Sequence, residues 1–204
     1  MTTAATAPVP RFEYPPSLQE YMVSEKDYLK QHPEYRALCT GIAVFNQEGK
    51  LLLVQRSASE KAFPNAWVSS EFTEQRYSAP ADSLKEIPGG KVDDTDETVL
   101  HGAVRELKEE TGLEATRIVR KVGEFWFADM KKANGQVSKW VKHIFEMEVK
   151  DLATVTVDPV EHQAYLFASE EEVIKERVGD VELKYITAEN KAIKLDAFAY
   201  RQSA

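Results

Sequence analysis

The apolar positions of this chain repeat at two spacings, and each spacing predicts a different type of element. A helical spacing predicts amphipathic helices over residues 17–31 and 187–202, and a capping pattern from Ser169 to Glu172 opens a further helix. Runs rich in β-branched and aromatic residues predict strands at 36–45, 51–55, 118–127, 137–149 and 163–167. The first two strands flank a short turn and are expected to form a hairpin. Strands interrupted by helices predict an α/β fold with a mixed sheet between helices.

The best-defined helix lies between Thr98 and Gly112. Thr98 or Asp96 can accept the first free backbone amides, and Gly112 supplies the left-handed residue at which helices commonly end. Its apolar stripe consists of residues three and four positions apart, namely Leu100, Ala103, Val104, Leu107 and Thr111. This stripe is expected to face the core.

Three glutamates, Glu106, Glu109 and Glu110, stand beside this stripe. With a rotation of about 100° per residue they turn to one side of the helix, where like charges repel one another. A hard divalent cation such as Mg²⁺ binds oxygen ligands at this density and removes the repulsion. The glycine pair that ends at Gly90 lets the backbone approach closely, so the Gly90 carbonyl is expected to complete the site. The pattern predicts a metal site built from oxygen ligands alone.

These residues resemble the Nudix box, in which a glycine, a glutamate and an Arg-Glu-aliphatic-any-Glu-Glu-any-Gly-aliphatic string follow at fixed spacing. Residues 105–113, RELKEETGL, fit the string without a mismatch, and Glu97 stands seven residues before Arg105 as the pattern requires. Six residues rather than five separate Gly90 from Glu97, and strict spacing from the glycine would select Asp96 instead. We expect Glu97 and Arg105 to support the site structurally, while the alternative pairing of Arg105 with Asp96 stays open.

The resemblance covers roughly residues 36–179 and implies the Nudix α/β/α sandwich with its metal-dependent hydrolysis of diphosphates. Mg²⁺ is the implied cofactor, with Mn²⁺ as a substitute. The implied metal ligands are Gly90, Glu106, Glu109 and Glu110. Family members use either a glutamate of the box or an acid from a later loop as general base. The expected catalytic residues are therefore Glu106, Glu109 and Glu161, although Glu161 could instead cap the element that follows it.

The substrate is expected to be a small molecule that carries a diphosphate. An arginine at the end of the strand 51–55 often faces substrate phosphates in the family, so Arg56 is an expected ligand, with a solvated strand end as the alternative. Lys91, directly after the glycine turn, is the second expected substrate-binding residue. A nucleoside diphosphate derivative and an organic diphosphate such as a prenyl diphosphate both stay open. The family's isopentenyl-diphosphate isomerase chemistry is disfavoured, because its cysteine is absent near residues 68–85.

A Nudix-fold sensor that binds a nucleotide without cleaving it is the non-enzymatic alternative. The acidic positions of the box are all filled, which favours the enzyme. The chain of 204 residues has 26 basic and 34 acidic residues, so its net charge is 26 − 34 = −8. This charge argues against nucleic acid as a partner and requires a cation between the protein and an anionic substrate. No membrane or export segment is evident, so we expect a cytoplasmic protein, with a homodimer as one option.

The expected organisation is a loose leader over residues 1–16 followed by a single domain over residues 17–204, with a helix near each end. Cys39 is the only cysteine and is expected to be a small core residue. The family commonly joins a tryptophan directly to Glu-Ile-Pro-Gly-Gly, but here residues 68–85 separate Trp67 from Glu86. This insertion could be a lid over the active site, a surface loop without a role, or a retained intron translated in frame.

Overall fold

A computed structural model of the chain describes residues 12–57, 85–128, 139–183, 185, 188–199 and 201. Most of the expected leader 1–16 lies outside these ranges, and so does the expected polar loop 131–136. Of the insertion 68–85, only the backbone of its last residue is described. The three interpretations of the insertion therefore stay predictions. Among the described residues, no helix is long and apolar enough to cross a membrane.

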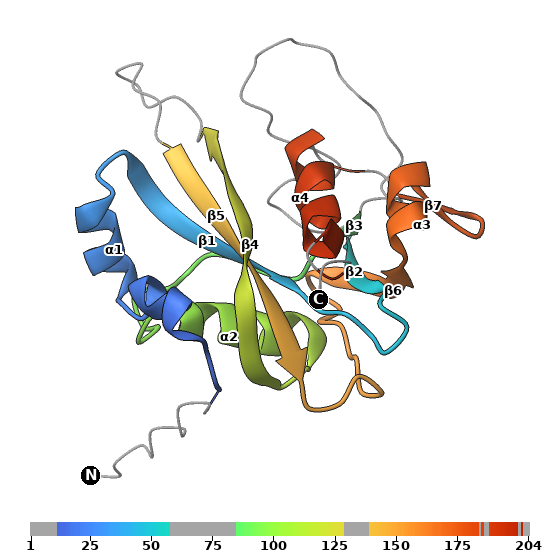
Figure 1. The fold of residues 1–204 in the computed structure, drawn as a ribbon, viewed down its shortest axis with the longest axis horizontal. Coiled ribbons are helices and arrows are strands. Elements are labelled where there is room, and N and C mark those ends of the chain that lie inside the picture. The colour runs from blue at the N-terminus through green and yellow to red at the C-terminus, as the bar shows by residue number, and fades with distance from the viewer. Residues whose placement is uncertain are drawn as a thin grey trace.

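Groups of strands are separated by helices along the chain (Figure 1). In chain order the elements are η1 (Pro16–Tyr21), α1 (Glu25–Gln31), β1 (Tyr35–Ala43), β2 (Leu51–Arg56), β3 (Lys85–Glu86), α2 (Val99–Thr111), β4 (Ala115–Ala128), β5 (Lys139–Val149), β6 (His162–Ala168), α3 (Glu170–Lys175), β7 (Arg177–Val178), β8 (Val181–Glu182) and α4 (Ala188–Ala199). The strand order is β1-β5-β4 in one sheet and β3-β2-β6 in another, and β7 and β8 form a separate two-stranded pair. Because β1 runs parallel to β5 while β4 runs antiparallel to it, the first sheet is mixed, and the predicted α/β class is confirmed.

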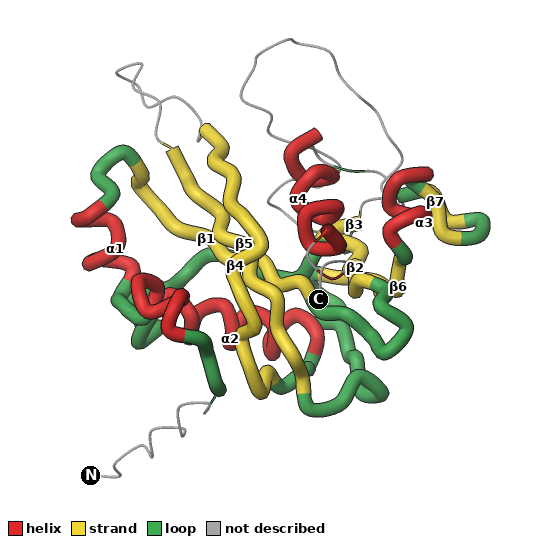
Figure 2. The backbone as a smooth tube through the Cα atoms, in the orientation of Figure 1, coloured by secondary structure: helices red, strands yellow, loops and turns green. Residues whose placement is uncertain are grey.

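Helices cover both faces of the sheet β1-β5-β4 (Figure 2). Neighbouring residues of a strand point to opposite faces, and β1 shows this with Ile42 and Ala43. Ile42 packs in the same apolar cluster as Leu100 of α2. Ala43 packs in a second cluster, together with Ile193 of α4. Each face of the sheet therefore has its own core, one beneath α2 and the other beneath α4.

The hairpin expected from β1 and β2 is present only near its turn, and the prediction that the two strands pair along their length is wrong. Near the turn, the Leu52 amide donates to the Val44 carbonyl at 2.8 Å, and Phe45 forms an isolated bridge with Leu51. The two strands then separate, because β1 pairs with β5 while β2 pairs with β3 and β6. The side chains of β2 from Leu51 to Val54 are completely buried. Such an uninterrupted apolar run is typical of a central strand, and it does not reveal which neighbour the strand pairs with.

The expected single helix over residues 17–31 is divided into η1 and α1. Ser24 lies between them in an extended conformation, and its hydroxyl accepts a hydrogen bond from the Asp27 amide at 3.2 Å. A serine that caps a helix in this way cannot also continue a preceding one, since its backbone is not helical. The capping box from Ser169 to Glu172 at the start of α3 is present as predicted.

A buried polar network attaches α1 to the sheet. The Tyr28 hydroxyl on α1 and Nε2 of His143 on β5 are hydrogen-bonded at 2.7 Å. The His143 side chain is fully buried, and its Nδ1 lies 3.1 Å from Oε2 of Glu124 on β4. Burial, with a smaller contribution from the Lys121 ammonium, lowers the His143 pKa to about 4, although Glu124 acts in the opposite direction. The imidazole is therefore neutral in the folded protein at neutral pH.

Acidification below pH 6.5 is expected to destabilise the fold through His143. In the unfolded chain its pKa is about 6.5, so between that pH and about 4 the unfolded state binds a proton that the folded state does not. From pH 7 to pH 5 this group should reduce the free energy of unfolding by about 2 kcal/mol. Urea titrations of the wild type and of His143→Gln at both pH values measure this difference. Equal losses in the two proteins would contradict the prediction.

Candidate active site

Helix α2 carries the acidic residues, and its ends are fixed by the residues that the sequence predicted. The Thr98 hydroxyl accepts a hydrogen bond from the His101 amide at 3.3 Å, so Thr98 and not Asp96 is the N-cap. Gly112 ends the helix in the left-handed conformation with φ of 70°, and its amide donates to the Lys108 carbonyl. The predicted stripe from Leu100 to Thr111 is buried.

The three glutamates of α2 lie beside this stripe but differ in exposure. Glu106 and Glu110 are buried, whereas the Glu109 side chain is 57% exposed. The Arg105 guanidinium lies between two of them, and its Nη1 donates to Oε1 of Glu106 at 2.9 Å and to Oε2 of Glu109 at 2.6 Å. Oε2 of Glu110 accepts a hydrogen bond from the Gly89 amide at 2.7 Å. Each carboxylate therefore keeps a second oxygen for another ligand.

Arg105 is paired with Asp96 rather than with the expected Glu97. Nε and Nη2 of Arg105 donate to the two carboxylate oxygens of Asp96 at 2.8 and 2.9 Å. Glu97 lies instead near His101, with 3.9 Å between its Oε2 and the ring Nε2. Asp96, which the spacing counted from Gly90 selects, is therefore the partner of Arg105, and the expected support of Arg105 by Glu97 is wrong.

The loop conformation explains why Asp96 reaches the arginine. Gly102 of α2 has no side chain at the point of contact, where an added Cβ would lie 2.8 Å from Oδ2 of Asp96. The same oxygen accepts a hydrogen bond from the Asp93 amide at 2.8 Å. Burial alone would raise the pKa of the Asp96 carboxyl, but the bonds from Arg105 and from the backbone keep it below its ordinary value. Asp96 is thus an ionised anchor between the loop and α2.

The glycine turn is attached to the edge of β1. The Thr40 amide donates to the Gly90 carbonyl at 2.8 Å, and the Ile42 amide donates to the Pro88 carbonyl at 2.7 Å. Gly89 has φ of 139°, and a Cβ there would lie 2.2 Å from the Thr40 carbonyl oxygen, so no other residue fits. A Cβ on Gly90 would lie 2.5 Å from Oε2 of Glu106. The glycine therefore leaves space for the carboxylate directly beside the turn.

The loop before β6 brings two further residues to the acids. One potential ligand atom each of Glu110, Glu161 and His162 lies within 4.8 Å of the others. The loop is held in place because the Ser57 amide donates to the Glu161 carbonyl at 2.7 Å and the Asp158 amide donates to the Glu110 carbonyl at 3.3 Å. The sequence selected Glu161 but favoured a structural role for the adjacent His162, because that residue shares no helical or strand spacing with α2.

Crowding of acids in a poorly solvated place raises their pKa values. Burial raises the pKa of Glu110 to about 8, and the nearby Glu106 and Glu161 act in the same direction, while the Gly89 amide and Lys142 oppose them. Burial also raises the pKa of Glu106. A divalent cation among these oxygens would offset both the burial and the mutual repulsion. The donor set and the space beside Gly90 therefore fit a cation.

Lys142 of β5 is a basic residue near this site that sequence analysis missed. It stands opposite Cys39 of β1 in the parallel register. Its Cε lies 2.9 Å from where a Cβ on Gly41 would stand, so the side chain crosses the surface of β1 at that glycine. Gly89 packs against the same glycine, because its own Cβ would lie 2.6 Å from the Gly41 Cα. The lysine thus extends along the wall that also carries the glycine turn.

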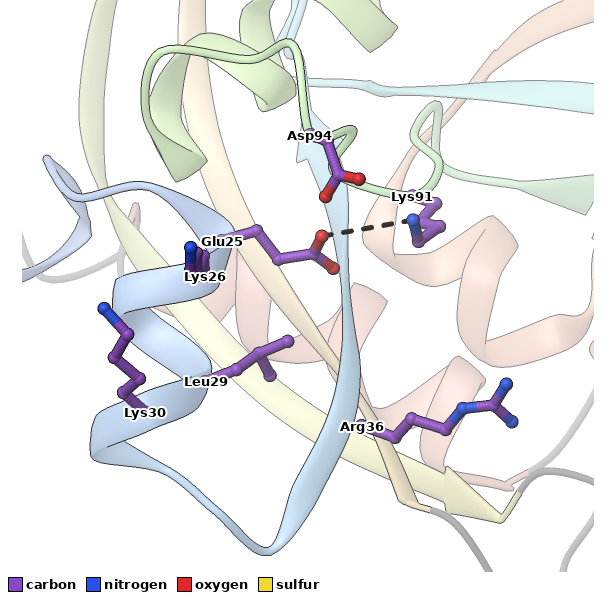
Figure 3. A pocket seen from close by; sticks show the side chains of 7 residues that line it. All are labelled: Glu25, Lys26, Leu29, Lys30, Arg36, Lys91 and Asp94. Atoms are coloured by element: carbon purple, nitrogen blue, oxygen red, sulfur yellow. Dashed lines mark ion pairs between the residues drawn. The ribbon is translucent and has the colours of Figure 1, made fainter.

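The two expected substrate-binding residues occupy different places. Arg56, at the end of β2, is in register with His162 of β6 and so lies beside the loop of Glu161. Lys91 lies in a pocket of about 500 Å³ between α1 and β1 (Figure 3), and its Nζ is 4.0 Å from Oε2 of Glu25. The pocket is lined by Glu25, Lys26, Leu29, Lys30, Arg36, Lys91 and Asp94. Lys91 therefore shares its surroundings with two acids.

Comparisons with known proteins agree with this geometry. Residues 35–188 match the family model described as the NUDIX domain. The CTP pyrophosphohydrolase of Escherichia coli (strain K12) is 30% identical over 147 residues, which cover 72% of this chain and 86% of that protein. An RNA pyrophosphohydrolase of Bartonella quintana (strain Toulouse) is 28% identical over 137 residues, covering 62% of this chain and 69% of that protein. The crystal structure of a MutT protein from Methanosarcina mazei Go1 has a TM-score of 0.55 at 20% identity, and the match covers 82% of this chain and 96% of that structure.

Replacing Asp96 by asparagine is expected to destabilise the protein by about 1–3 kcal/mol, because the buried partner of Arg105 loses its charge. The matched change Glu97→Gln should alter stability by less than about 0.5 kcal/mol, since Glu97 is exposed. Urea unfolding at neutral pH and low ionic strength measures both effects. Equal losses, or a larger loss for Glu97→Gln, would show that the pairing is different in solution.

Proposed function

The chain belongs to the Nudix family and is a Nudix-type diphosphohydrolase, and we propose that its catalytic site lies between α2 and the loop before β6. The observation that carries this proposal is the approach of Glu161 to Glu110, which unites the box helix with an acid from a distant loop. Glu106 lies close enough to raise the pKa of Glu110, as Glu161 also does. Nudix hydrolases use divalent cations, and we propose Mg²⁺ or Mn²⁺ for this chain.

The box residues would bind the cation and orient its ligands. Glu106, Glu109, Glu110 and the Gly90 carbonyl would hold the cation, because each retains an oxygen lone pair that the contacts above do not use. When bound, the cation neutralises diphosphate oxygens and makes the attacking water more acidic. Arg105 would keep two of the carboxylates oriented.

Glu161 is the proposed general base. The water oxygen would form a bond to one phosphorus while the bridging P–O bond breaks, and the departing phosphate would keep the electron pair of that bond. Glu161 would take the proton of the water, since it is the exposed acid of the cluster and can exchange that proton with solvent. Arg56 would contact the phosphate oxygens from the end of β2, and Lys142 would contact them from β5.

A nucleotide is the proposed substrate class. The names of two relatives, a CTP pyrophosphohydrolase and an RNA pyrophosphohydrolase, favour a nucleotide over a prenyl diphosphate. The net charge of −8 favours a small nucleotide over a long nucleic acid, because an extended polyanion would be repelled. CTP is therefore the first compound to test, with a prenyl diphosphate as the comparison.

The variants Glu109→Gln and Glu110→Gln are expected to lower kcat on CTP by about 100-fold or more, because each removes a charged ligand without changing size. Glu114→Gln is the matched control, since Glu114 follows α2 and is exposed. Phosphate or diphosphate release with and without Mg²⁺ measures turnover. Tight binding of CTP without any turnover, in the wild type and with either cation, would instead identify a sensor.

Lys142→Met is expected to lower kcat/KM on the same substrate by about 10- to 150-fold, since a charge-assisted hydrogen bond to phosphate contributes about 1.5–3 kcal/mol. Most of the effect should appear in KM, and Lys142→Arg should restore part of it. Lys150→Met serves as the control, because the Lys150 side chain is 74% exposed. Unchanged kinetics in Lys142→Met would exclude the lysine from phosphate binding.

A further inference from the structure

His162 places an imidazole among the acids of the site. It is the first residue of β6, it is only 2% exposed, and it contributes one of the ligand atoms that lie within 4.8 Å of one another. The other two atoms belong to Glu110, which is also buried, and to Glu161, which is exposed. A cation could therefore enter from the side of Glu161 and meet an oxygen and a nitrogen deeper inside.

The backbone fixes the three residues relative to one another. The His162 amide donates to the Asp158 carbonyl at 2.7 Å, and the Asp158 amide donates to the Glu110 carbonyl at 3.3 Å. The Ser57 amide donates to the Glu161 carbonyl at 2.7 Å, which attaches the loop to the end of β2. Glu110 thus belongs to helix α2 and His162 to strand β6, while Glu161 is held by its hydrogen bond to Ser57 at the end of β2.

The distances between the three potential ligand atoms, one each from Glu110, Glu161 and His162, suit a metal ion. Metal–ligand bonds to oxygen and nitrogen are about 2.0–2.2 Å long, so two donors on opposite sides of an ion lie up to about 4.4 Å apart. Atoms within 4.8 Å of one another need to move by only a few tenths of an ångström to reach such positions. Side-chain torsions of Glu161 can supply this movement, because that side chain is at the surface.

We propose that Glu110, Glu161 and His162 bind a first-row transition-metal ion such as Mn²⁺ through two oxygens and one nitrogen, in preference to Mg²⁺. Mg²⁺ binds oxygen ligands and keeps much of its water, whereas imidazole is a good ligand for transition metals. The oxygen-only donor set expected from the sequence carries no such preference. The inference rests on the proposed function in that both use Glu110 and Glu161, and Glu161 would bind the ion through one carboxylate oxygen while its second oxygen accepts the proton. It concerns binding rather than turnover.

The direct test is a nitrogen signal from the bound ion. Full-length protein loaded with Mn²⁺, without substrate, is examined by electron spin echo envelope modulation, which detects nitrogen bonded to the metal. Protein made with ¹⁵N-labelled histidine should replace the ¹⁴N modulation by that of ¹⁵N, and this comparison needs no substitution. His162→Gln should lose the signal, whereas His32→Gln should keep it, because His32 lies at the end of α1.

A second measurement compares the two cations. Calorimetric titration should give tighter binding of Mn²⁺ than of Mg²⁺ in the wild type, and His162→Gln should reduce the ratio of the two affinities by about tenfold. Circular dichroism confirms that the variant is folded before it is titrated. Mn²⁺ that binds without any histidine coupling would overturn the inference, and CTP hydrolysis in the same preparation would show that the proposed function still holds. Loss of both binding and hydrolysis would overturn both.

Discussion

The site depends on one constraint, which is the position of the Arg105 guanidinium among four oxygen-bearing groups. It donates two hydrogen bonds to Asp96, one each to Glu106 and Glu109, and one to the Lys91 carbonyl at 3.1 Å. These bonds raise the arginine pKa above its ordinary range, with the bonds to Asp96 as the largest cause. The guanidinium therefore joins the loop, the glycine turn and the acidic side of α2. Without it, the carboxylates would repel one another and the Lys91 carbonyl would lose its hydrogen bond to the helix.

The two sheets contribute to the site in different ways. β1 fixes the glycine turn through backbone hydrogen bonds at Thr40 and Ile42, so the turn behaves as an additional short edge segment of the mixed sheet. β2, in the other sheet, fixes the loop of Glu161 through Ser57. Helix α2 contacts both parts, by the bond from Gly89 to Glu110 and by the bond from Asp158 to the Glu110 carbonyl. The proposed site therefore takes residues that both sheets hold in place, and neither sheet alone would bring them together.

Local features of the site could be predicted from the sequence, and contacts between distant segments could not. The caps of α2 at Thr98 and Gly112 depend on residues within one helical turn, so the sequence contains their cause. The choice between Asp96 and Glu97 depends on Gly102 and on the loop conformation, which the box spacing indicates only indirectly. His162 and Lys142 come from strands that pair with distant partners, so no local spacing connects them to the acids. The pairing of β1 and β2 with different strands could not be predicted for the same reason, because it depends on segments distant in the sequence.

Segments outside the family match also take part in the structure that supports the site. Leu18 of η1 and Tyr28 of α1 precede the matched residues 35–188, yet both belong to the apolar cluster that lies beneath α2. Glu25 of α1 is buried, and its Oε1 accepts a hydrogen bond from the Leu38 amide at the edge of β1 at 3.2 Å. The Val92 amide donates to the Leu38 carbonyl just after the glycine turn. Since α1 and the turn bind the same residue of β1, the N-terminal segment stabilises the edge to which the proposed metal-binding turn is attached.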